Sequence, residues 1–206
     1  MELLLASGNA KKLREVRGLL EPLGVRVLSP EDVGGLPDVL EDRPDFAGNA
    51  SKKAIEAARK TGRWCLADDS GLEVDALDGA PGVRSARFAG EPADDARNNA
   101  KLLAELSGRP DAERGARFVC ALALANPGGE VVEEIEGAAR GRILEAPRGA
   151  GDFGYDPLFL FTEEGHPQTG RGFAELEPAD KSAISHRGRA LRALLDRLPA
   201  HLGACS

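Results

Sequence analysis

The stretch MELLLASGNAKKLREVRGLLEPLGVRVL, residues 1–28, decides the fold class. Residues 1–7 are an apolar run broken by a Ser-Gly-Asn turn signal, and apolar residues then recur at helical spacing up to residue 20. Gly24 ends this helix, and residues 25–28 predict a second strand. A strand, a tight turn, a helix and a further strand are typical of an α/β protein.

The next part of the chain continues this alternation. Asp45 predicts the cap of a helix that ends at Gly62, and residues 64–67 predict a buried strand. Residues 68–91 are rich in Gly and Asp and predict a loop, and long loops of this kind usually carry function. A helix is expected over residues 94–106.

The last part contains a hairpin and a final helix. Residues 117–125 and 130–138 predict two strands joined by an Asn-Pro-Gly-Gly turn, and residues 156–161 predict a short strand. Ser185 predicts the cap of a helix with one apolar stripe. Early alternation followed by a hairpin favours an α/β fold with a mixed sheet.

The composition predicts one globular domain over residues 1–206. Hydrophobic residues make up 42% and charged residues 30% of the chain, and no apolar run approaches the roughly 18 residues of a membrane span. The formal net charge is −7, from 27 Lys and Arg against 34 Asp and Glu. This balance argues against binding of polymeric nucleic acid, whereas a small anionic ligand can still bind in a local basic pocket.

The cysteines and the amino terminus predict the compartment. Cys65, Cys120 and Cys205 form no C-x-x-C pair and have no histidine at metal-ligand spacing, so we expect neither a disulfide framework nor a structural zinc site. The first residues lack the basic start and the cleavage-like end of a signal peptide. A cytoplasmic protein is therefore expected.

The first candidate site is the turn between the first strand and the first helix. Backbone N–H groups and the positive end of a helix can hold phosphate there, beside a lysine side chain. The alternative is an ordinary turn capped by Asn9 with two solvated lysines. The G-x-x-x-x-G-K-[ST] pattern is absent, so P-loop chemistry has no support. The candidate residues are Ser7, Gly8, Asn9, Ala10, Lys11 and Lys12.

The second candidate is an acidic pair, Asp68 and Asp69, with Glu41 in an earlier acidic stretch. Side chains alternate across a strand, so the two adjacent carboxylates are expected to point in different directions. Carboxylates at the end of a strand bind hard cations such as Mg²⁺ and position water in α/β proteins. The alternative is a solvated Asx turn capped by Ser70.

Two later segments carry weaker signals. Residues 149–154 match G-x-G-x-x-G, but a strand-like segment follows instead of a helix, so the dinucleotide-binding context is missing. Phe153 and Tyr155 in this segment either pack in the core or stack on a flat base. His186 and Arg187 lie in the first turn of the last helix, where cations call for an anionic or hydrogen-bond-accepting partner. The alternative is a surface arginine beside a satisfied histidine.

Four motifs occur in order along nearly the whole chain. They are SGNAKK at residues 7–12, LADDSGLEVDALDGAPGVRSARFAG at residues 66–90, FGYDPLF at residues 153–159 and KSAISHR at residues 181–187. Together they resemble the inosine triphosphatase family, the pyrophosphatases of noncanonical purine nucleoside triphosphates. The resemblance implies a long mixed β-sheet with flanking helices, two lobes around a central substrate cleft, and a homodimer.

The resemblance also implies roles for the matching residues. Ser7 to Lys12 hold the triphosphate, Glu41 and Asp69 bind Mg²⁺, and Asp69 is the base for the attacking water. Lys53 is the second catalytic residue, on the phosphate side. Ser70 follows into the substrate site. The base pocket, with an aromatic ring for stacking, consists of Phe153, Gly154, Tyr155 and Asp156. The residues that recognise the 6-oxo purine are Lys181, His186 and Arg187.

The implied reaction converts ITP, dITP or XTP to the monophosphate and pyrophosphate and so cleanses the nucleotide pool. Two alternatives stay open, a related pyrophosphatase with another base preference and a regulator that binds nucleotide without turnover. One departure concerns the metal: Gly48 stands where the family pattern predicts an acidic residue, so the full set of metal ligands is open.

Overall fold

The computed structural model describes residues 2–150 and 153–202. The chain forms two compact units. The first unit consists of Met1–Asp69, Cys120–Gly137 and Arg187–Ser206, and the second of Ser70–Val119 and Ala138–His186. Each unit therefore joins segments that are far apart in the sequence.

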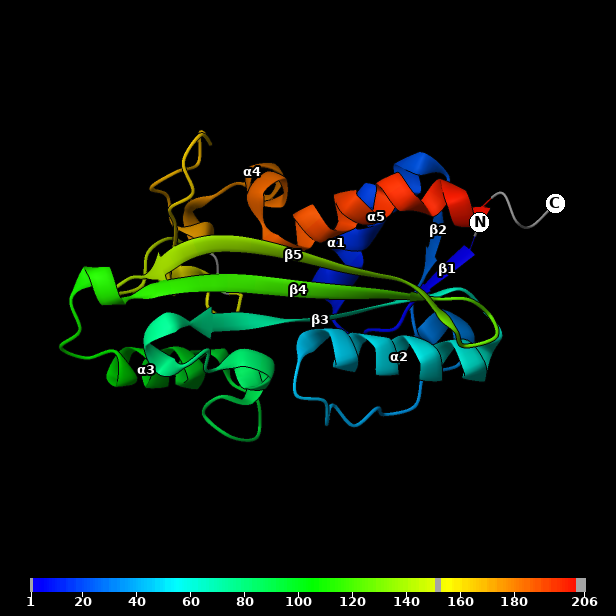
Figure 1. Ribbon diagram of the computed structural model, residues 1–206, viewed down its shortest axis with the longest axis horizontal. Coiled ribbons are helices and arrows are strands. Elements are labelled where there is room, and N and C mark those ends of the chain that lie inside the picture. The colour runs from blue at the N-terminus through cyan, green and yellow to red at the C-terminus, as the bar shows by residue number, and fades with distance from the viewer. Residues whose placement is uncertain (1, 151–152, 203–206) are drawn as a thin grey trace. The chain divides into compact units, whose positions relative to one another are not determined.

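The strands of the described chain form a six-stranded sheet in the order β2-β1-β3-β4-β5-β6 (Figure 1). β1 pairs in parallel with β2 and β3, whereas β5 pairs antiparallel with β6, so the sheet is mixed as predicted. The strands are β1 Glu2–Leu5, β2 Arg26–Leu28, β3 Cys65–Val74, β4 Gly115–Ala125, β5 Val131–Ile143 and β6 Phe159–Phe161.

The helices begin and end largely where the sequence predicts. Asp45 accepts a hydrogen bond from the N–H of Gly48 at the start of α2, and Gly62 ends that helix in the left-handed region with φ 63°. Asp94 caps α3 in the same way. The short helix α4 was not predicted. The helices are α1 Ala10–Leu20, α2 Phe46–Thr61, α3 Asp95–Glu105, α4 Pro178–Ile184 and α5 His186–Leu202.

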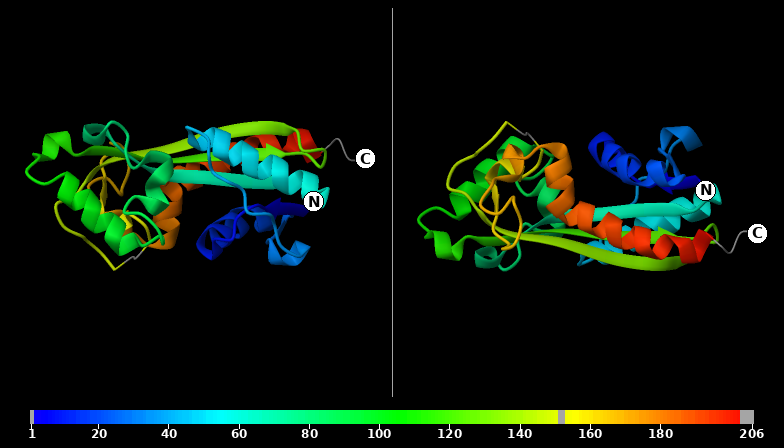
Figure 2. Two further views of the ribbon diagram at one scale, coloured as in Figure 1. Left: turned by 90° about the horizontal axis from the view of Figure 1, so that it is seen from below. Right: turned by 90° about the horizontal axis from the view of Figure 1, so that it is seen from above.

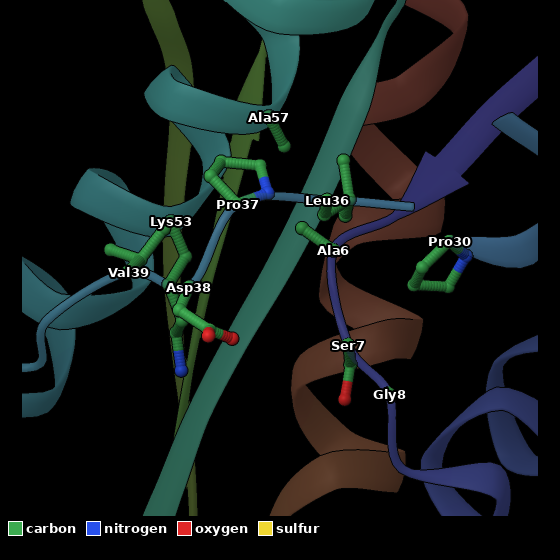
Figure 3. Close-up of a pocket in the computed structure, with 10 residues that line it drawn as sticks. All are labelled: Ala6, Ser7, Gly8, Pro30, Leu36, Pro37, Asp38, Val39, Lys53 and Ala57. Carbon is green, nitrogen blue, oxygen red and sulfur yellow. The ribbon is translucent and has the colours of Figure 1, made fainter. Parts of the chain in front are cut away.

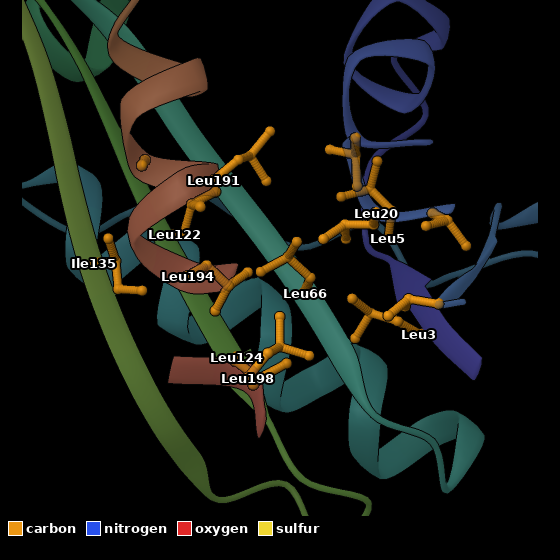
Figure 4. Packing of buried hydrophobic residues seen from close by; sticks show 14 of the residues in the cluster. Leu3, Leu5, Leu20, Leu66, Leu122, Leu124, Ile135, Leu191, Leu194 and Leu198 are labelled. Carbon is orange, nitrogen blue, oxygen red and sulfur yellow. The ribbon is translucent and has the colours of Figure 1, made fainter. Parts of the chain in front are cut away.

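In the first unit, α1 and α5 cover one face of the sheet and α2 covers the other (Figures 1 and 2). The apolar stripe of α5, including Leu191, Leu194 and Leu198, packs with β-strand leucines such as Leu66 and Leu124, all of them buried (Figure 4). The predicted core role of this stripe is confirmed. Burial of each such side chain contributes about 1.5–3 kcal/mol relative to exposure.

The second unit has an aromatic core. Phe118 on β4 lies 4.7 Å from Phe159 and 5.7 Å from Phe173, measured between ring centroids. Phe159 and Phe173 are 4.7 Å apart and tilted by 60°. Such tilted and stacked pairs add to the free energy of burying the rings. Leu102 of α3 belongs to the same buried cluster, so the helix is fixed against this core.

Two sequence predictions need correction. The loop predicted over residues 68–91 is wrong at its start, because β3 runs on to Val74 and the acidic pair lies inside a strand. Polar residues can occupy this buried strand because cations from helices neutralise them, which the local pattern does not reveal. The strand predicted over residues 156–161 is also shorter, since Asp156–Leu158 form a 3₁₀ turn and only Phe159–Phe161 are strand.

Within the part of the chain that the structure describes, no helix is long and apolar enough to cross a membrane.

Candidate active site

Strand β3 presents its two aspartates to different helices. Asp68 contacts Lys12 of α1 and Arg187 of α5, whereas Asp69 contacts Lys53 of α2. Because α1 and α5 lie on one face of the sheet and α2 on the other, the predicted divergence of the two carboxylates is confirmed. Both aspartates are buried, so the alternative of a solvated Asx turn is wrong.

Asp68 is a buried carboxylate between two cations. Its Oδ2 lies 2.9 Å from Lys12 Nζ and 3.3 Å from Arg187 Nε, and the residue is only 2% exposed. Burial opposes ionisation, but the charges of Lys12 and Arg187 outweigh it and hold the pKa of Asp68 well below its usual range. Asp68 is therefore an ionised anchor for both cations.

Asp69 has a different environment. Lys53 Nζ donates to its Oδ1 at 2.8 Å, and the buried amide of Asn49 donates to its Oδ2 at 3.3 Å. Burial raises the pKa of Asp69, the charge of Lys53 opposes that rise, and the nearby carboxylate of Glu41 adds to it, so the net shift is upward. A carboxylate with a raised pKa is a better proton acceptor than an exposed aspartate.

Lys53 brings the predicted metal ligands together. Its ammonium donates to Glu41 Oε1 at 2.9 Å, to Asp69 Oδ1 at 2.8 Å and to the carbonyl oxygen of Asp68 at 2.8 Å. Burial lowers the pKa of Lys53, but the charges of Asp69 and Glu41 outweigh it and the net shift is upward. The lysine is therefore a cation, and its ammonium group binds one carboxylate oxygen of Glu41 and one of Asp69.

These residues fit a hard divalent cation. Carboxylate oxygens are the ligands that Mg²⁺ prefers, and this ion commonly takes one or two of them and completes its shell with water and phosphate. Across residues 2–150 and 153–202, no group of three or more His, Cys, Asp or Glu side chains forms a ready-made metal cage. A cation held by Glu41 and Asp69 therefore leaves coordination positions for a phosphate ligand.

Gly48 is explained by the helix cap. The N–H of Gly48 donates to Asp45 Oδ1 at 2.7 Å, and a Cβ at this position would lie 3.0 Å from that oxygen and 3.0 Å from Arg43 Cβ. A side chain here would require Arg43 or Asp45 to shift by a few tenths of an ångström. Glycine at this position therefore lets the cap by Asp45 form without that shift.

The turn after β1 is held by its own side chains. Asn9 Oδ1 accepts hydrogen bonds from the N–H groups of Lys11 at 2.9 Å and Lys12 at 3.2 Å, so the predicted Asn9 cap is confirmed. The alternative of two solvated lysines is wrong for Lys12, which pairs with the buried Asp68 at 2.9 Å. The N–H of Asn9 donates to Ser7 Oγ at 3.2 Å. This order fixes the helix N-terminus, and the positive end of a helix attracts anions.

A cavity of about 240 Å³ lies beside this turn. Ser7 and Gly8 line it from the turn, and Lys53 lines it from α2 (Figure 3). Asp38 belongs to the same lining. The cavity therefore joins the turn predicted to hold phosphate to the lysine that also binds Glu41 and Asp69.

Arg187 lies in the first unit and is buried. Its guanidinium contacts Glu15 Oε2 at 2.6 Å and Asp68 Oδ2 at 3.3 Å, and the residue is 4% exposed. Burial lowers the pKa of Arg187, but the charges of Asp68 and Glu15 outweigh it and the net shift is upward. The alternative of a surface arginine is wrong. The predicted anionic partner exists, and it is a pair of carboxylates within the protein.

Residues 153–156 form a loop in the second unit, which we call the 153–156 loop. Tyr155 is buried, its hydroxyl donates to the carbonyl oxygen of Ser85 at 2.8 Å, and burial raises its pKa. Lys181 pairs with the buried Asp156, and its Nζ lies 5.6 Å from the centroid of the Phe153 ring. Core packing is thus confirmed for Tyr155, whereas Phe153 is half-buried. Two residues of the glycine motif, Gly151 and Asp152, lie outside the described residues.

His186 is the first residue of α5, as predicted. Its ring stacks on Phe118 with centroids 4.8 Å apart and planes inclined by 13°. The histidine is buried, and its plane is set by the aromatic core of the second unit. Ser70, the remaining predicted substrate residue, is half-buried in β3 and begins the second unit.

The structure divides the predicted residues between the units. The first unit contains Ser7, Gly8, Asn9, Ala10, Lys11, Lys12, Glu41, Lys53, Asp69 and Arg187, and the second contains Ser70, Phe153, Gly154, Tyr155, Asp156, Lys181 and His186. Sequence reasoning missed Asn49 and Phe118, and it gave Glu15 no role. Only Asn49 carried a local signal, because it lies four residues before Lys53 and thus on the same helix face.

The match to known proteins places the chain in a family. The chain belongs to the Ham1 family, whose model matches residues 3–197. The resemblance drawn from the four sequence motifs is thereby confirmed.

Curated relatives and solved structures match over nearly their full length. A dITP/XTP pyrophosphatase of Desulforamulus reducens is 52% identical over 204 residues, which is 98% of each chain. One of Geobacter sulfurreducens is 52% identical over 95% of this chain and 96% of its own. The structure of a HAM1 protein from Coxiella burnetii has a TM-score of 0.86 at 41% identity and covers 97% of this chain and 99% of that chain.

Proposed function

We propose that this protein hydrolyses noncanonical purine nucleoside triphosphates, namely ITP, dITP and XTP, to the monophosphate and pyrophosphate. The observation that carries the proposal is the convergence of Glu41 and Asp69 on the Lys53 ammonium beside a helix N-terminus. Relatives named dITP/XTP pyrophosphatase, at 52% identity over 95–98% of this chain, support the reaction.

A divalent cation is assigned to Glu41 and Asp69, and Mg²⁺ is the proposed ion. The hard oxygen donors and the absence of thiolate or imidazole from this pair favour Mg²⁺ over softer metals. When bound, the ion supplies positive charge that offsets the negative charge of the phosphates. Lys53 bonds to both carboxylates and also lines the cavity with Ser7 and Gly8, so its charge lies on the side assigned to phosphate.

Asp69 is the proposed base. Its raised pKa suits it to orient a water molecule and accept a proton from it as the water oxygen bonds to the α-phosphorus. The bond from the α-phosphorus to the bridging oxygen breaks, and pyrophosphate leaves with the electron pair of that bond. Asn49 keeps the second carboxylate oxygen in place during this step through its 3.3 Å hydrogen bond.

The turn of residues 7–12 is assigned to the triphosphate. Its ordered N-terminus and the cation Lys12 provide positive potential, and Lys53 adds a second lysine. Lys12 is paired with Asp68 at 2.9 Å, so the lysine is already held near the turn. A triphosphate then competes with one buried carboxylate for this ammonium.

The 153–156 loop, with Lys181 and His186, is assigned to the base. The half-buried Phe153 ring provides a face for stacking, and the fixed ring of His186 provides a hydrogen-bonding edge for the 6-oxo group. Donors aimed at a 6-oxo group discriminate against the 6-amino group of adenine, because a mismatched polar pair is costly. Arg187 was predicted to join this group, and that role remains a prediction.

Three further predictions accompany this proposal. The family resemblance implies a homodimer, the cysteines and the first residues predict a cytoplasmic location, and the composition predicts a single domain over residues 1–206. Sedimentation of the purified protein tests the first of them.

A triphosphate panel tests the proposed reaction. Purified protein is incubated with Mg²⁺ and ITP, dITP, XTP, GTP or ATP, and pyrophosphate and orthophosphate are detected separately. We expect pyrophosphate from the first three substrates, much faster than from ATP. Orthophosphate as the first product would place the attack on the γ-phosphorus and overturn the proposal.

The two alternatives give different outcomes in the same panel. A pyrophosphatase with another base preference releases pyrophosphate fastest from ATP, GTP or a pyrimidine triphosphate added to the set. A regulator binds ITP without releasing either product. Omission of Mg²⁺, with EDTA present, is expected to abolish turnover because Glu41 and Asp69 supply no positive charge of their own.

A further inference from the structure

Helix α3 holds Gly154 of the 153–156 loop by both of its backbone groups. Asp95 Oδ2 accepts a hydrogen bond from the Gly154 N–H at 2.8 Å, and Asn99 Nδ2 donates to the Gly154 carbonyl oxygen at 2.9 Å. Asp95 and Asn99 are four residues apart and so lie on one face of the helix. All three residues belong to the second unit.

We call these two hydrogen bonds, between Gly154 and the side chains of Asp95 and Asn99, the clamp. The clamp fixes a residue with an unusual backbone conformation. Gly154 has φ +55°, in the left-handed region that side-chain-bearing residues rarely adopt. No atom of residues 2–150 or 153–202 outside the glycine and its chain neighbours lies within 4 Å of the position that a Cβ would occupy, so the backbone conformation is what favours glycine here. Two hydrogen bonds from a packed helix therefore select one conformation of an otherwise permissive residue.

The orientation of Asn99 shows that the amide is directed at the loop. A carbonyl oxygen can only accept, so the NH₂ group must face Gly154. Among the described residues, this leaves Asn99 Oδ1 buried with no hydrogen-bond partner, which is a cost in stability. The adjacent Asn98 is different, because both of its amide groups are satisfied by the backbone of Ala86 and Ala89.

We propose that Asp95 and Asn99 are positioning residues that set the geometry of base recognition by fixing Gly154. The inference rests on the proposed function, in which the 153–156 loop contacts the base. Tyr155 and Asp156 are anchored separately, to Ser85 and Lys181. The two hydrogen bonds to Gly154 thus act on the residue directly after Phe153, the ring assigned to stacking.

The test compares binding of a base-containing ligand with binding of phosphate alone. Inosine monophosphate and inorganic tripolyphosphate are used as competitive inhibitors of ITP hydrolysis, and KM and kcat for ITP are measured with them. The variants are Asn99→Ala and Asp95→Ala, each of which removes one hydrogen bond to Gly154. Asp95→Asn is the conservative variant, since its amide oxygen can still accept from the Gly154 N–H. Asn98→Ala is the matched control on the same helix.

We expect Asn99→Ala and Asp95→Ala to weaken inosine monophosphate about 3- to 10-fold, the size of one hydrogen bond, and to raise KM for ITP similarly. Tripolyphosphate inhibition and kcat should change by less than about twofold, because the removed hydrogen bonds go to Gly154, a residue assigned to the base and not to the phosphates. Asp95→Asn should restore most of the affinity. Asn98→Ala should lower the unfolding temperature but change the inhibition constants of the two inhibitors by the same factor.

Equal weakening of both inhibitors, or unchanged inhibition by inosine monophosphate in both alanine variants, would overturn the inference. If Asn99→Ala does not fold, the Asp95→Ala and Asp95→Asn pair, on an exposed residue, decides the matter. Failure of the proposed function looks different, because the wild-type protein itself would then not release pyrophosphate from ITP.

Discussion

The polar groups of the two units are held in different ways. In the first unit, carboxylates and cations hold one another: Asp68 has Lys12 and Arg187, and Asp69 has Lys53. In the second unit, the 153–156 loop has one ion pair, Asp156 with Lys181. Its other anchors are hydrogen bonds with backbone atoms, between Gly154 and the side chains of Asp95 and Asn99 and from the Tyr155 hydroxyl to the Ser85 carbonyl oxygen.

This difference predicts how each region responds to change. Removal of one partner from a buried charge pair leaves an uncompensated charge, which is costly. Removal of one neutral hydrogen bond costs far less. Single substitutions in the charged region should therefore have large effects. Substitutions in the loop region should have small effects that differ between a ligand with a base and phosphate alone.

The largest effect is expected at Asp69. Asp69→Asn keeps the shape of the side chain but removes the charge and the proton acceptor, so kcat for ITP should fall by about 10²–10⁴. Folding is expected to survive, because the amide oxygen can still accept from Lys53 and only the 3.3 Å hydrogen bond from Asn49 is lost. Kinetics of pyrophosphate release and a thermal unfolding curve measure the two effects.

Asp68→Asn is the comparison variant for Asp69→Asn. It removes the ionised anchor of Lys12 and Arg187, so its main effect should be on stability. Near-normal turnover in Asp69→Asn with lost turnover in Asp68→Asn would show that the base is the other carboxylate.

Loss of Arg187 should give the largest change in stability. Arg187→Ala leaves Asp68 buried beside one remaining cation, and the free energy of unfolding should fall by about 3–5 kcal/mol. Arg197→Ala is the matched control on the same helix, because its pair with Glu133 is exposed and should change stability by no more than about 1 kcal/mol. Urea unfolding of the three proteins measures both. Similar losses in the two variants would mean that burial does not separate the pairs.

Arg187→Ala also tests the base role predicted from the sequence. If Arg187 contacts the 6-oxo group, the ITP-to-ATP ratio of kcat/KM should shrink by roughly 1.5–3 kcal/mol, typical of a charge-assisted hydrogen bond. If it only anchors Asp68 and Glu15, the ratio should be unchanged while stability falls. The ratio for Lys12→Ala, which alters the phosphate site, is the control.

A smaller effect is expected in the pH dependence of the free energy of unfolding, to which the ionised Asp68 contributes. Its pKa in the folded state lies below the ordinary value of 3.8, so the unfolded state binds the proton more readily. The stabilisation by ionised Asp68 is thus present above pH 3.8 and is lost as the pH falls below that value. The free energies of unfolding of the wild type and Asp68→Asn, measured by urea unfolding with EDTA present, should therefore converge as the pH falls in that range. A difference that stays constant from pH 6 to pH 3 would contradict this assignment.

The smallest effect is expected in the loop region. Tyr155→Phe removes the hydrogen bond to the Ser85 carbonyl oxygen but keeps the buried ring, so the free energy of unfolding should fall by about 1 kcal/mol. Urea unfolding measures the change. A loss as large as that of Arg187→Ala would show that the two regions do not differ as described.

Local patterns in the sequence determined most of the element boundaries. Asp45 and Gly62 mark the ends of α2, and the cap by Asn9 begins α1, because caps and left-handed glycines act within a few residues. The alternation of side chains also predicted that Asp68 and Asp69 diverge. The four motifs contain most of the candidate residues, and the family resemblance they carry assigned roles to Glu41 and Lys53 outside them.

Only the tertiary structure decided which partners these residues have. The continuation of β3 through the acidic pair depends on cations from helices as distant in sequence as Arg187, and no local pattern reports a charge that arrives from more than a hundred residues away. The same holds for the clamp of α3 on Gly154, in which 55 and 59 residues separate the partners. Sequence periodicity gives the face on which a side chain lies, whereas packing of whole elements determines what that face meets.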